Sequence, residues 1–318
     1  MHPKESAGNM EEMLRQTLKS IEALKAQSGS DDSGMQEELI EIESQLMSLL
    51  ARQKEIRPPY ERVKMARRVG RPTTLYYIEQ LLDSFVELKG DRLGQDDPAI
   101  VGGVGLFQGR PVTVIGHQKG RNTQENIRRN FGMPQPSGYR KAMRLMEQAQ
   151  KFGRPILLFV DTPGAYCGIN AEEKGQAEAI AQCIRKGFTL TVPVLSFVIG
   201  EGGSGGALAL GVADRVYMLE NSVYSIISPE GFASILWKDN TRAVEASSIM
   251  KLTSFDLYSG GIVDGILEEP QEGADVDPEA VAERIRQTIR RDLKELDLLE
   301  PDTRQSLRFH KYRIIGVV

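Results

Sequence analysis

The stretch Val198-Ile-Gly-Glu-Gly-Gly-Ser-Gly-Gly-Ala-Leu-Ala-Leu-Gly211 decides how the rest of this chain is interpreted. It continues an apolar run, residues 192–199, that is typical of a buried parallel strand, and it leads into small residues, 207–210, that can form a helix. Five glycines within residues 200–206 leave the backbone N–H groups open to a ligand. N–H groups at the start of a helix attract negative charge, so the stretch predicts a site for a phosphate, a carboxylate or a reaction oxyanion.

Composition limits the classes of protein to which the chain can belong. Its 318 residues, 40% of them hydrophobic, suffice for one large domain with an appendage. The formal net charge of −4 gives no electrostatic reason to expect nucleic-acid binding. No signal segment and no run long enough for a membrane span is present, so we expect no membrane association. Cys167 and Cys183 form no C-x-x-C pair, and we therefore expect no bound metal, no disulfide framework and a cytoplasmic location.

The pattern of the chain changes near residue 57. Residues 1–57 hold two short amphipathic segments on either side of the breaker Gly29-Ser-Asp-Asp-Ser-Gly34, which predicts a helical hairpin. Residues 58–318 alternate between strand and helix patterns, which predicts an α/β domain with parallel strands. We expect strands at 99–107, 111–116, 155–160, 192–199, 215–219 and 222–227, the first two as a hairpin, and helices at 74–89, 171–186, 229–237 and 280–296.

The glycine stretch permits several interpretations. Gly200-x-Gly202-x-x-Gly205, with Glu220 further on, fits a dinucleotide-binding fingerprint, although that fingerprint normally opens the first βαβ unit. A phosphate-binding P-loop is excluded because Gly206-Ala207 stands where Lys-Ser/Thr is required. A turn with only a packing role is a further alternative. We favour a backbone oxyanion hole.

A second glycine loop supports this preference. Asp161-Thr-Pro-Gly-Ala-Tyr-Cys-Gly168 directly follows the predicted strand 155–160 and precedes a predicted helix. Because parallel strands end at the same edge of a sheet, the two loops should meet there, where ligands bind in α/β sheets. The two loops together predict a pocket.

Six segments of the chain, in order, resemble the carboxyltransferase alpha subunits of multi-subunit bacterial acetyl-CoA carboxylases. They are Ile115–Gly120, Asn130–Pro134, Gly138–Ala142, Asp161–Tyr166, Gly200–Ala207 and Ile227–Gly231. Six ordered motifs across two hundred residues are far more specific than any one of them. Cys167 departs from the pattern, since the family usually has proline there.

The resemblance implies a crotonase-type α/β fold, a spiral of β-β-α units, behind the N-terminal α-hairpin. It also implies carboxyl transfer from carboxybiotin to acetyl-CoA, which gives malonyl-CoA in the first committed step of fatty acid synthesis. In this reaction the biotin ureido nitrogen can take the acetyl α-proton, so the protein need not supply a strong acid–base pair. It must stabilise two developing oxyanions, which backbone N–H groups do without titrating.

Transferred to this sequence, the resemblance assigns oxyanion donation to two glycines and substrate binding to five neighbouring residues: Gly205 and Gly206 for the first role, and Gly164, Ala165, Gly202, Gly203 and Ala207 for the second. It implies no covalently held cofactor, since carboxybiotin arrives on a separate carrier protein and acetyl-CoA is a substrate. A beta subunit is expected to complete an α2β2 heterotetramer and to hold the only zinc. The biotin carboxyl carrier protein and the biotin carboxylase are expected as further partners.

Two other enzyme classes stay open: a free-standing crotonase-type hydratase, isomerase or acyl-CoA hydrolase, and a dinucleotide-dependent oxidoreductase. His117 is interpreted as a structural histidine, with catalysis as the alternative. Asp161 and Glu201 could act as bases or brace their turns. The basic residues from Lys119 to Arg144 form either a solvated helix face or a contact for coenzyme A phosphates or an acidic partner. We expect no nucleophilic role for Cys167, because no paired histidine is evident.

Overall fold

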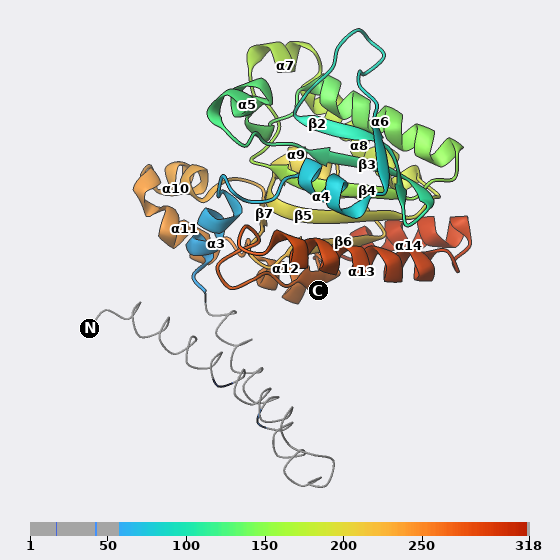
Figure 1. The fold of residues 1–318 in the computed structure, drawn as a ribbon. Helices are drawn as coiled ribbons and strands as arrows, with labels where there is room; N and C mark the ends of the chain where they lie inside the picture. Colours follow the sequence, from blue (N-terminus) through green and yellow to red (C-terminus); the bar gives the residue numbers. More distant parts are fainter. Residues whose placement is uncertain (1–16, 18–41, 43–56, 317–318) are drawn as a thin grey trace, which may run out of the picture. The chain divides into compact units, whose positions relative to one another are not determined.

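An eight-stranded sheet lies at the centre of residues Pro59–Val318 in this computed structural model, which describes residues 17, 42 and 57–316 (Figure 1). The chain divides into this unit and a second one, Met1–Pro58. The helical hairpin predicted for residues 1–57 falls on residues outside those described, apart from Thr17, Ile42 and Arg57. The hairpin and the boundary at residue 57 therefore stay predictions.

The strands run in the order β1-β2-β3-β4-β5-β6-β8, and β7 pairs with the end of β5. β2 is antiparallel to its neighbours β1 and β3, and all pairings from β3 onward are parallel, which confirms the predicted α/β class. The strands are β1 Ser84–Glu87, β2 Ile100–Phe107, β3 Arg110–His117, β4 Ile156–Thr162, β5 Val194–Gly203, β6 Arg215–Leu219, β7 Val223–Ser225 and β8 Gly265–Leu267.

Helices cover both faces of this sheet (Figure 1). The long ones are α6 (Pro136–Lys151), α8 (Gln176–Thr189), α13 (Pro278–Leu296) and α14 (Pro301–Arg313). The shorter ones are α3 Pro59–Ala66, α4 Thr74–Leu81, α5 Thr123–Arg128, α7 Ile169–Glu173, α9 Ser204–Leu208, α10 Pro229–Trp237, α11 Ala243–Ile249 and α12 Ser254–Ser259, with 3-10 turns at Asn130–Gly132 and Asn240–Arg242.

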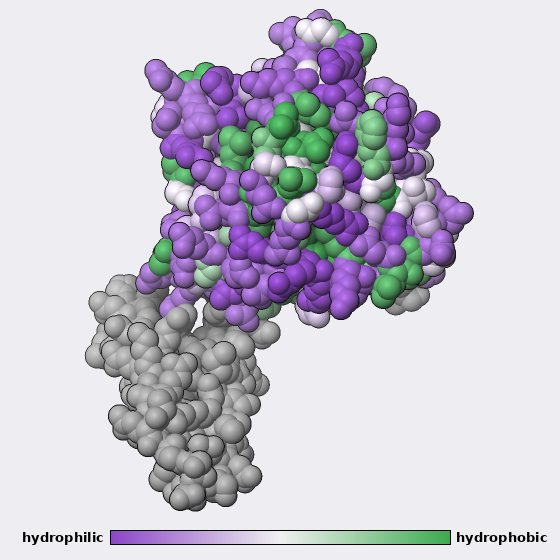
Figure 2. All heavy atoms as spheres, turned by 45° about the vertical axis from the view of Figure 1, so that its right-hand side comes forward, coloured by the Kyte–Doolittle hydropathy of each residue, from purple (hydrophilic) through white to green (hydrophobic). Residues whose placement is uncertain are grey.

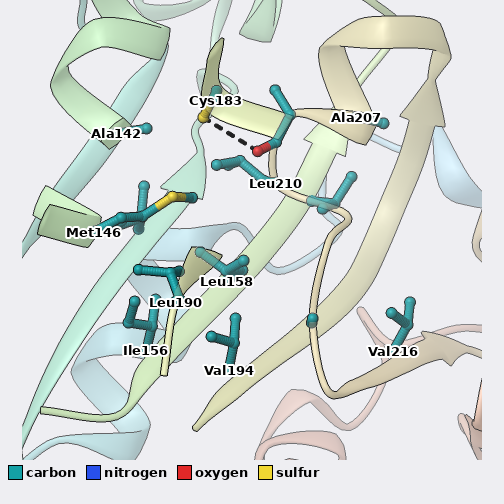
Figure 3. Packing of buried hydrophobic residues seen from close by; sticks show 14 of the residues in the cluster. Ala142, Met146, Ile156, Leu158, Cys183, Leu190, Val194, Ala207, Leu210 and Val216 are labelled. Atoms are coloured by element: carbon teal, nitrogen blue, oxygen red, sulfur yellow. Dashed lines mark hydrogen bonds between the residues drawn. The ribbon is translucent and has the colours of Figure 1, made fainter. Parts of the chain in front are cut away.

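The central strands bury both of their faces, because successive side chains point to opposite sides of the sheet. In β4, Ile156, Leu158 and Val160 pack with α6 and α8, whereas Leu157 and Phe159 pack with α4 and α13. Figure 3 shows the first of these cores, where Cys183 of α8 donates a 3.2 Å hydrogen bond to the carbonyl of Ala209. In the second core, aromatic rings stack in sequence across α4, β4, β5 and β6: Tyr77, Phe159, Phe197 and Tyr217.

Several predicted elements are confirmed and others are wrong. The hairpin β2–β3, the helix at 229–237 and the helix at 280–296 are present, the last beginning two residues earlier. The predicted helix 74–89 ends at Leu81, since residues 84–87 form β1 against β2. Gly103 and Gly105 of β2 explain this pairing, because a Cβ at either position would collide with a β1 carbonyl oxygen.

Other boundaries are also corrected. The predicted helix 171–186 is broken between α7 and α8 by Gly175, whose φ of +79° lies in the left-handed region. The strand expected to end at residue 199 continues through the glycines to Gly203, so the following helix begins at Ser204. The strand predicted at 222–227 is limited to β7.

The surface is mixed in character. On the face shown in Figure 2, hydrophilic side chains cover most of the surface, and apolar side chains gather in separate patches between them. Within the described ranges, no helix has both the length and the apolar character of a membrane span.

Candidate active site

The two glycine loops meet at the carboxyl ends of β4 and β5. Thr162 of β4 lies opposite Gly202 of β5, and the Thr162 hydroxyl contacts both the N–H and the carbonyl of Gly164. A Cβ at position 203 would lie 2.1 Å from the carbonyl oxygen of Pro163, and a Cβ at Gly206 would lie 2.6 Å from the nitrogen of Ala165. Glycine is needed at these two positions because each loop packs directly on the backbone of the other.

A cavity of about 680 Å³ opens beside these loops. Four of the seven predicted site residues line it, namely Gly164, Ala165, Gly205 and Gly206. Gly202 and Gly203 line a smaller neighbouring cavity of about 30 Å³. Ala207 is fully buried and packs in the core on the α6 and α8 side of the sheet (Figure 3). The structure thus brings all seven residues together, but at different distances from the main cavity.

The backbone of α9 faces this cavity with its first turn. Gly205 and Gly206 are the second and third residues of the helix, where N–H groups have no acceptor within the helix. A Cβ at Gly205 would meet only the side chain of Ile180, at 3.5 Å or more. Gly205 therefore leaves open space at the cavity, whereas Gly206 allows the neighbouring loop to approach.

Ser204 is a cavity residue that the sequence analysis missed. Its φ of +52° lies in the left-handed region, which a residue other than glycine rarely adopts. Such a conformation costs about 1–3 kcal/mol and persists only where the surroundings impose it. Ser204 makes the sharp change of direction between β5 and α9, and the spacing Gly202-x-Ser204-x-Gly206, typical of a strained strand-to-helix turn, is the signal that could have found it.

An ion-pair network reaches the cavity, which Arg67 and Glu201 line. Arg67 donates to Glu201 at 2.7 Å and to Glu230 of α10 at 2.8 Å. Lys119 contacts both Asp161 and Glu201 at 2.8 Å. Both carboxylate oxygens of Glu201 are thus occupied by cations, so Glu201 braces the turn and is not free to act as a base. The hydratase alternative loses its strongest candidate for acid–base work.

The dinucleotide alternative also loses a residue. Glu220, at the position of a ribose-binding acid, is 2% exposed, and its carboxylate accepts a 3.1 Å hydrogen bond from the backbone N–H of Glu269. The glycine turn leads into a helix of five residues, shorter than the helix that follows a pyrophosphate turn.

Four of the seven basic residues between 119 and 144 contact other parts of the fold, and for these four both interpretations in the sequence analysis are wrong. Lys141 is almost fully buried and contacts Asp96 at 2.6 Å, and Arg140 contacts Asp91 at 3.1 Å. Arg144 donates to the carbonyl groups of Leu88 and Gly90. Together with Lys119, these side chains are engaged inside the fold and are not held out toward a phosphate.

The two cysteines differ in environment. Cys167 is exposed and lines the cavity, whereas Cys183 is buried, which raises the pKa of its thiol to about 12. Among the residues that the structure describes, no group of three or more His, Cys, Asp or Glu side chains is arranged to hold a metal ion.

His117 is fully buried at the end of β3 and lies outside the cavity lining. Neither ring nitrogen makes a hydrogen bond of normal geometry. Burial lowers the pKa of the imidazole to about 3, and the nearby backbone of Phe159 and Gly206 opposes this shift only in part. The neutral ring favours the structural interpretation over the catalytic one.

This pKa predicts an acid-sensitive stability. The unfolded chain binds a proton at His117 below pH 6.5 and the folded chain does not, so the free energy of unfolding should fall by about 1.4 kcal/mol per pH unit from this residue as the pH drops toward 3. Between pH 6.5 and 5 the loss is about 2 kcal/mol. Urea unfolding of the wild type and His117→Gln at pH 7 and pH 5 measures it. Equal pH slopes for the two proteins would contradict the prediction.

Comparisons with known proteins agree on one family. A family model described as acetyl co-enzyme A carboxylase carboxyltransferase-like matches residues 8–316. The chain is 57% identical over 258 residues to the acetyl-coenzyme A carboxylase carboxyl transferase subunit alpha of Clostridium acetobutylicum, which covers 81% of this chain and 94% of the relative. It is 48% identical over 310 residues to the corresponding subunit of Staphylococcus epidermidis, with coverage of 98% and 99%. A Natranaerobius thermophilus protein, carboxyl transferase subunits beta/alpha, is 57% identical over 258 residues, 81% of this chain and 43% of its own length.

Solved structures agree on the fold. The chain is similar to transcarboxylase 12S, with a TM-score of 0.55 and 19% identity over 71% of this chain and 44% of that one. It is also similar to the Pseudomonas aeruginosa geranyl-CoA carboxylase beta subunit, with a TM-score of 0.57 and 16% identity over 78% and 46% of the two chains. The predicted crotonase-type α/β fold class is thus confirmed for residues 59–316, and the N-terminal hairpin stays a prediction.

Proposed function

The chain belongs to the acetyl-CoA carboxylase carboxyltransferase alpha-subunit family, and from this premise we propose that its cavity binds carboxybiotin during carboxyl transfer to acetyl-CoA. The position of Gly205 and Gly206 is the observation that carries the proposal. Both line the cavity, and both lie in the first turn of α9, where N–H groups lack helical acceptors. These amides are the donors for the oxygen that gains negative charge.

The cavity fits a substrate of this kind. Its volume of about 680 Å³ lies within the range of small-molecule sites, and the glycines of the two loops contribute backbone to its wall. Carboxybiotin brings the carboxyl group, and its ureido nitrogen takes the α-proton that acetyl-CoA loses. Biotin thus exchanges its carboxyl group for the proton of acetyl-CoA. The chain's part is to hold the ureido oxygen with the amides of Gly205 and Gly206. One such donor typically contributes about 2.7–4 kcal/mol of transition-state stabilisation.

The remaining site residues are proposed to shape this donor turn. Gly164 and Ala165 line the cavity beside the donor turn, and Gly203 lets their loop pack against the end of β5. Gly202 lies under the ring of Tyr224, and Ala207 fixes the helix to the core. Carboxybiotin therefore meets a wall made by two loops whose spacing is set by backbone contact.

The other half of the reaction is proposed to lie in a beta subunit within an α2β2 heterotetramer. That subunit supplies the second oxyanion hole, most contacts to acetyl-CoA and the zinc site. The Natranaerobius thermophilus relative, whose name joins subunits beta and alpha in one chain, supports this pairing. A biotin carboxyl carrier protein brings the carboxybiotin, and a biotin carboxylase loads it.

Malonyl-CoA formation should therefore need two chains. With carboxybiotin and acetyl-CoA, we expect product only when this chain is mixed with the beta subunit, because each chain holds one of the two oxyanion holes. Chromatography of coenzyme A thioesters measures it, and mixtures without carboxybiotin give the background. Product from this chain alone would contradict the shared site. No product with a correctly folded partner would contradict the proposed reaction itself.

A further inference from the structure

Lys119 lies outside the cavity lining but contacts both of the strand ends that carry the cavity loops. Its Nζ is 2.8 Å from Oδ1 of Asp161 and 2.8 Å from Oε2 of Glu201. Asp161 is the penultimate residue of β4, and Glu201 lies among the glycines at the end of β5. The Lys119 side chain is 19% exposed, and its backbone carbonyl accepts a 2.6 Å hydrogen bond from the buried Gln118. A fixed, largely buried ammonium thus joins the two strand ends.

The sheet is irregular at this point. β4 and β5 pair residue for residue up to Val160 and Val198, and pairing resumes where Thr162 lies opposite Gly202. Asp161 therefore faces residues 199–201 across a break in the ladder. Its Oδ1 accepts a 3.0 Å hydrogen bond from the N–H of Glu201 in this gap. Lys119 binds the same oxygen, so the ammonium supports the side-chain contact that replaces the missing backbone pairing.

Lys119 is one of two cations that face three carboxylates, so its removal would leave a single cation among them. The nearby carboxylates are Asp161, Glu201 and Glu230. The other cation beside Lys119 is Arg67, which binds Glu201 and Glu230. Two further arginines are engaged elsewhere, Arg71 with Glu269 and Arg68 with Asp275, and His117 is neutral. Burial would raise the pKa of Glu201, but Lys119 and Arg67 hold it below its usual value. Burial would likewise lower the pKa of Lys119, but Asp161 and Glu201 raise it.

We propose that Lys119 is a positioning residue for carboxyl transfer, which fixes the spacing between the 161–168 loop and the glycine turn and thereby the direction of the Gly205 and Gly206 amides. This inference rests on the proposed function of those amides. Lys119 acts through Asp161 and Glu201 and contacts neither substrate. Groups held by such a supporting contact keep a precise geometry that the loops alone do not impose.

Lys119→Met should lower kcat of the reconstituted complex by about 10- to 100-fold at pH 8, with a smaller change in KM for acetyl-CoA, because a small displacement of the donors has this effect. The loss should shrink toward pH 6, since a proton taken up by Glu201, whose pKa Lys119 no longer lowers, relieves its repulsion with Asp161. For the same reason, the double variant Lys119→Met/Glu201→Gln should recover part of the loss at pH 8. Lys119→Arg, which keeps the charge, should lose less than Lys119→Met.

Hydrogen exchange gives a readout that needs no activity. Amides of residues 200–207 should exchange faster in Lys119→Met than in the wild type. Lys311→Met is the matched control, because Lys311 is also 19% exposed and contacts one carboxylate, Asp264, at 2.8 Å. We expect no change at residues 200–207 in this control. Two results for Lys119→Met would overturn the positioning role. One is a kcat equal to that of the wild type at every pH. The other is a loss of kcat that does not depend on pH, together with unchanged amide exchange at residues 200–207. An inactive wild-type complex with faster exchange in Lys119→Met would instead contradict the proposed function, and it would leave Lys119 supported only as a brace between the two loops.

Discussion

In Gly206→Ala, kcat of the reconstituted carboxyltransferase should fall by about 10²–10³-fold. The new Cβ would lie 2.6 Å from the nitrogen of Ala165 and 2.8 Å from the carbonyl carbon of Gly164. Both are backbone atoms, so the strain cannot be relieved by turning a side chain. The 161–168 loop and the first turn of α9 must move apart, and the Gly206 N–H then leaves its place at the cavity. Steady-state kinetics of malonyl-CoA formation measures the effect.

Two control variants separate this effect from a general loss of stability. Gly205→Ala adds a methyl group that meets only Ile180 at ordinary contact distance, and it should lose less than about tenfold in kcat, or about 1.4 kcal/mol. Gly187→Ala introduces a clash of 2.8 Å with the Val212 side chain, away from the cavity, and should lower stability without lowering kcat of the folded complex. Wild-type kcat in Gly206→Ala would remove the amides of this turn from the mechanism. An equal loss in Gly187→Ala would show that any destabilisation has the same effect.

The meeting of the two glycine loops could be predicted from the sequence because it follows from local order. Each loop comes directly after a buried strand, and parallel strands end at a common edge. The reason for the individual glycines could not be predicted in this way. Gly203 and Gly206 are required by the backbone of Pro163 and Ala165, about forty residues earlier, and such a contact leaves no pattern in a single sequence.

The ion pairs of the site could not be predicted from local sequence patterns for the same reason. Arg67 lies 134 residues before Glu201 and 163 residues before Glu230. It directly follows α3, and no motif in that helix points to an ionic contact at the site. Lys119 looked like part of a basic surface because its neighbours in the sequence are basic, whereas its neighbours in space are acidic. The helix predicted at 74–89 failed similarly, since apolar spacing alone cannot reveal that the glycines of β2 accept an edge strand.

Arg71→Met should lower the free energy of unfolding by about 3–5 kcal/mol, the range for breaking one partner of a buried ion pair. Arg71 and Glu269 are 5% and 2% exposed, and they form a bidentate pair. Arg71 also donates to the carbonyl of Ile199 at 2.6 Å, directly before the glycine stretch. Its removal takes this cation from the buried Glu269 carboxylate, which keeps neutral donors such as the side-chain amide of Asn221 at 3.0 Å. Urea unfolding measures the loss.

The pH dependence of this loss identifies its cause. Burial alone would raise the pKa of Glu269, but Arg71 lowers it below its usual value, so the wild type gains stability from this group above about pH 4.3 and loses it as the pH falls. Without Arg71, burial dominates, the pKa of Glu269 rises, and the ionised form opposes folding as the pH increases. The difference between wild type and Arg71→Met should therefore widen from pH 4 to pH 7. Arg110→Met is the control, because Arg110 and Asp297 form a pair that is 38% and 40% exposed and should contribute about 0–1 kcal/mol. The free energy of unfolding lost in Arg71→Met could be as small as that lost in Arg110→Met, or it could be independent of pH. Either result would mean that the buried pair does not hold the start of the glycine stretch in place.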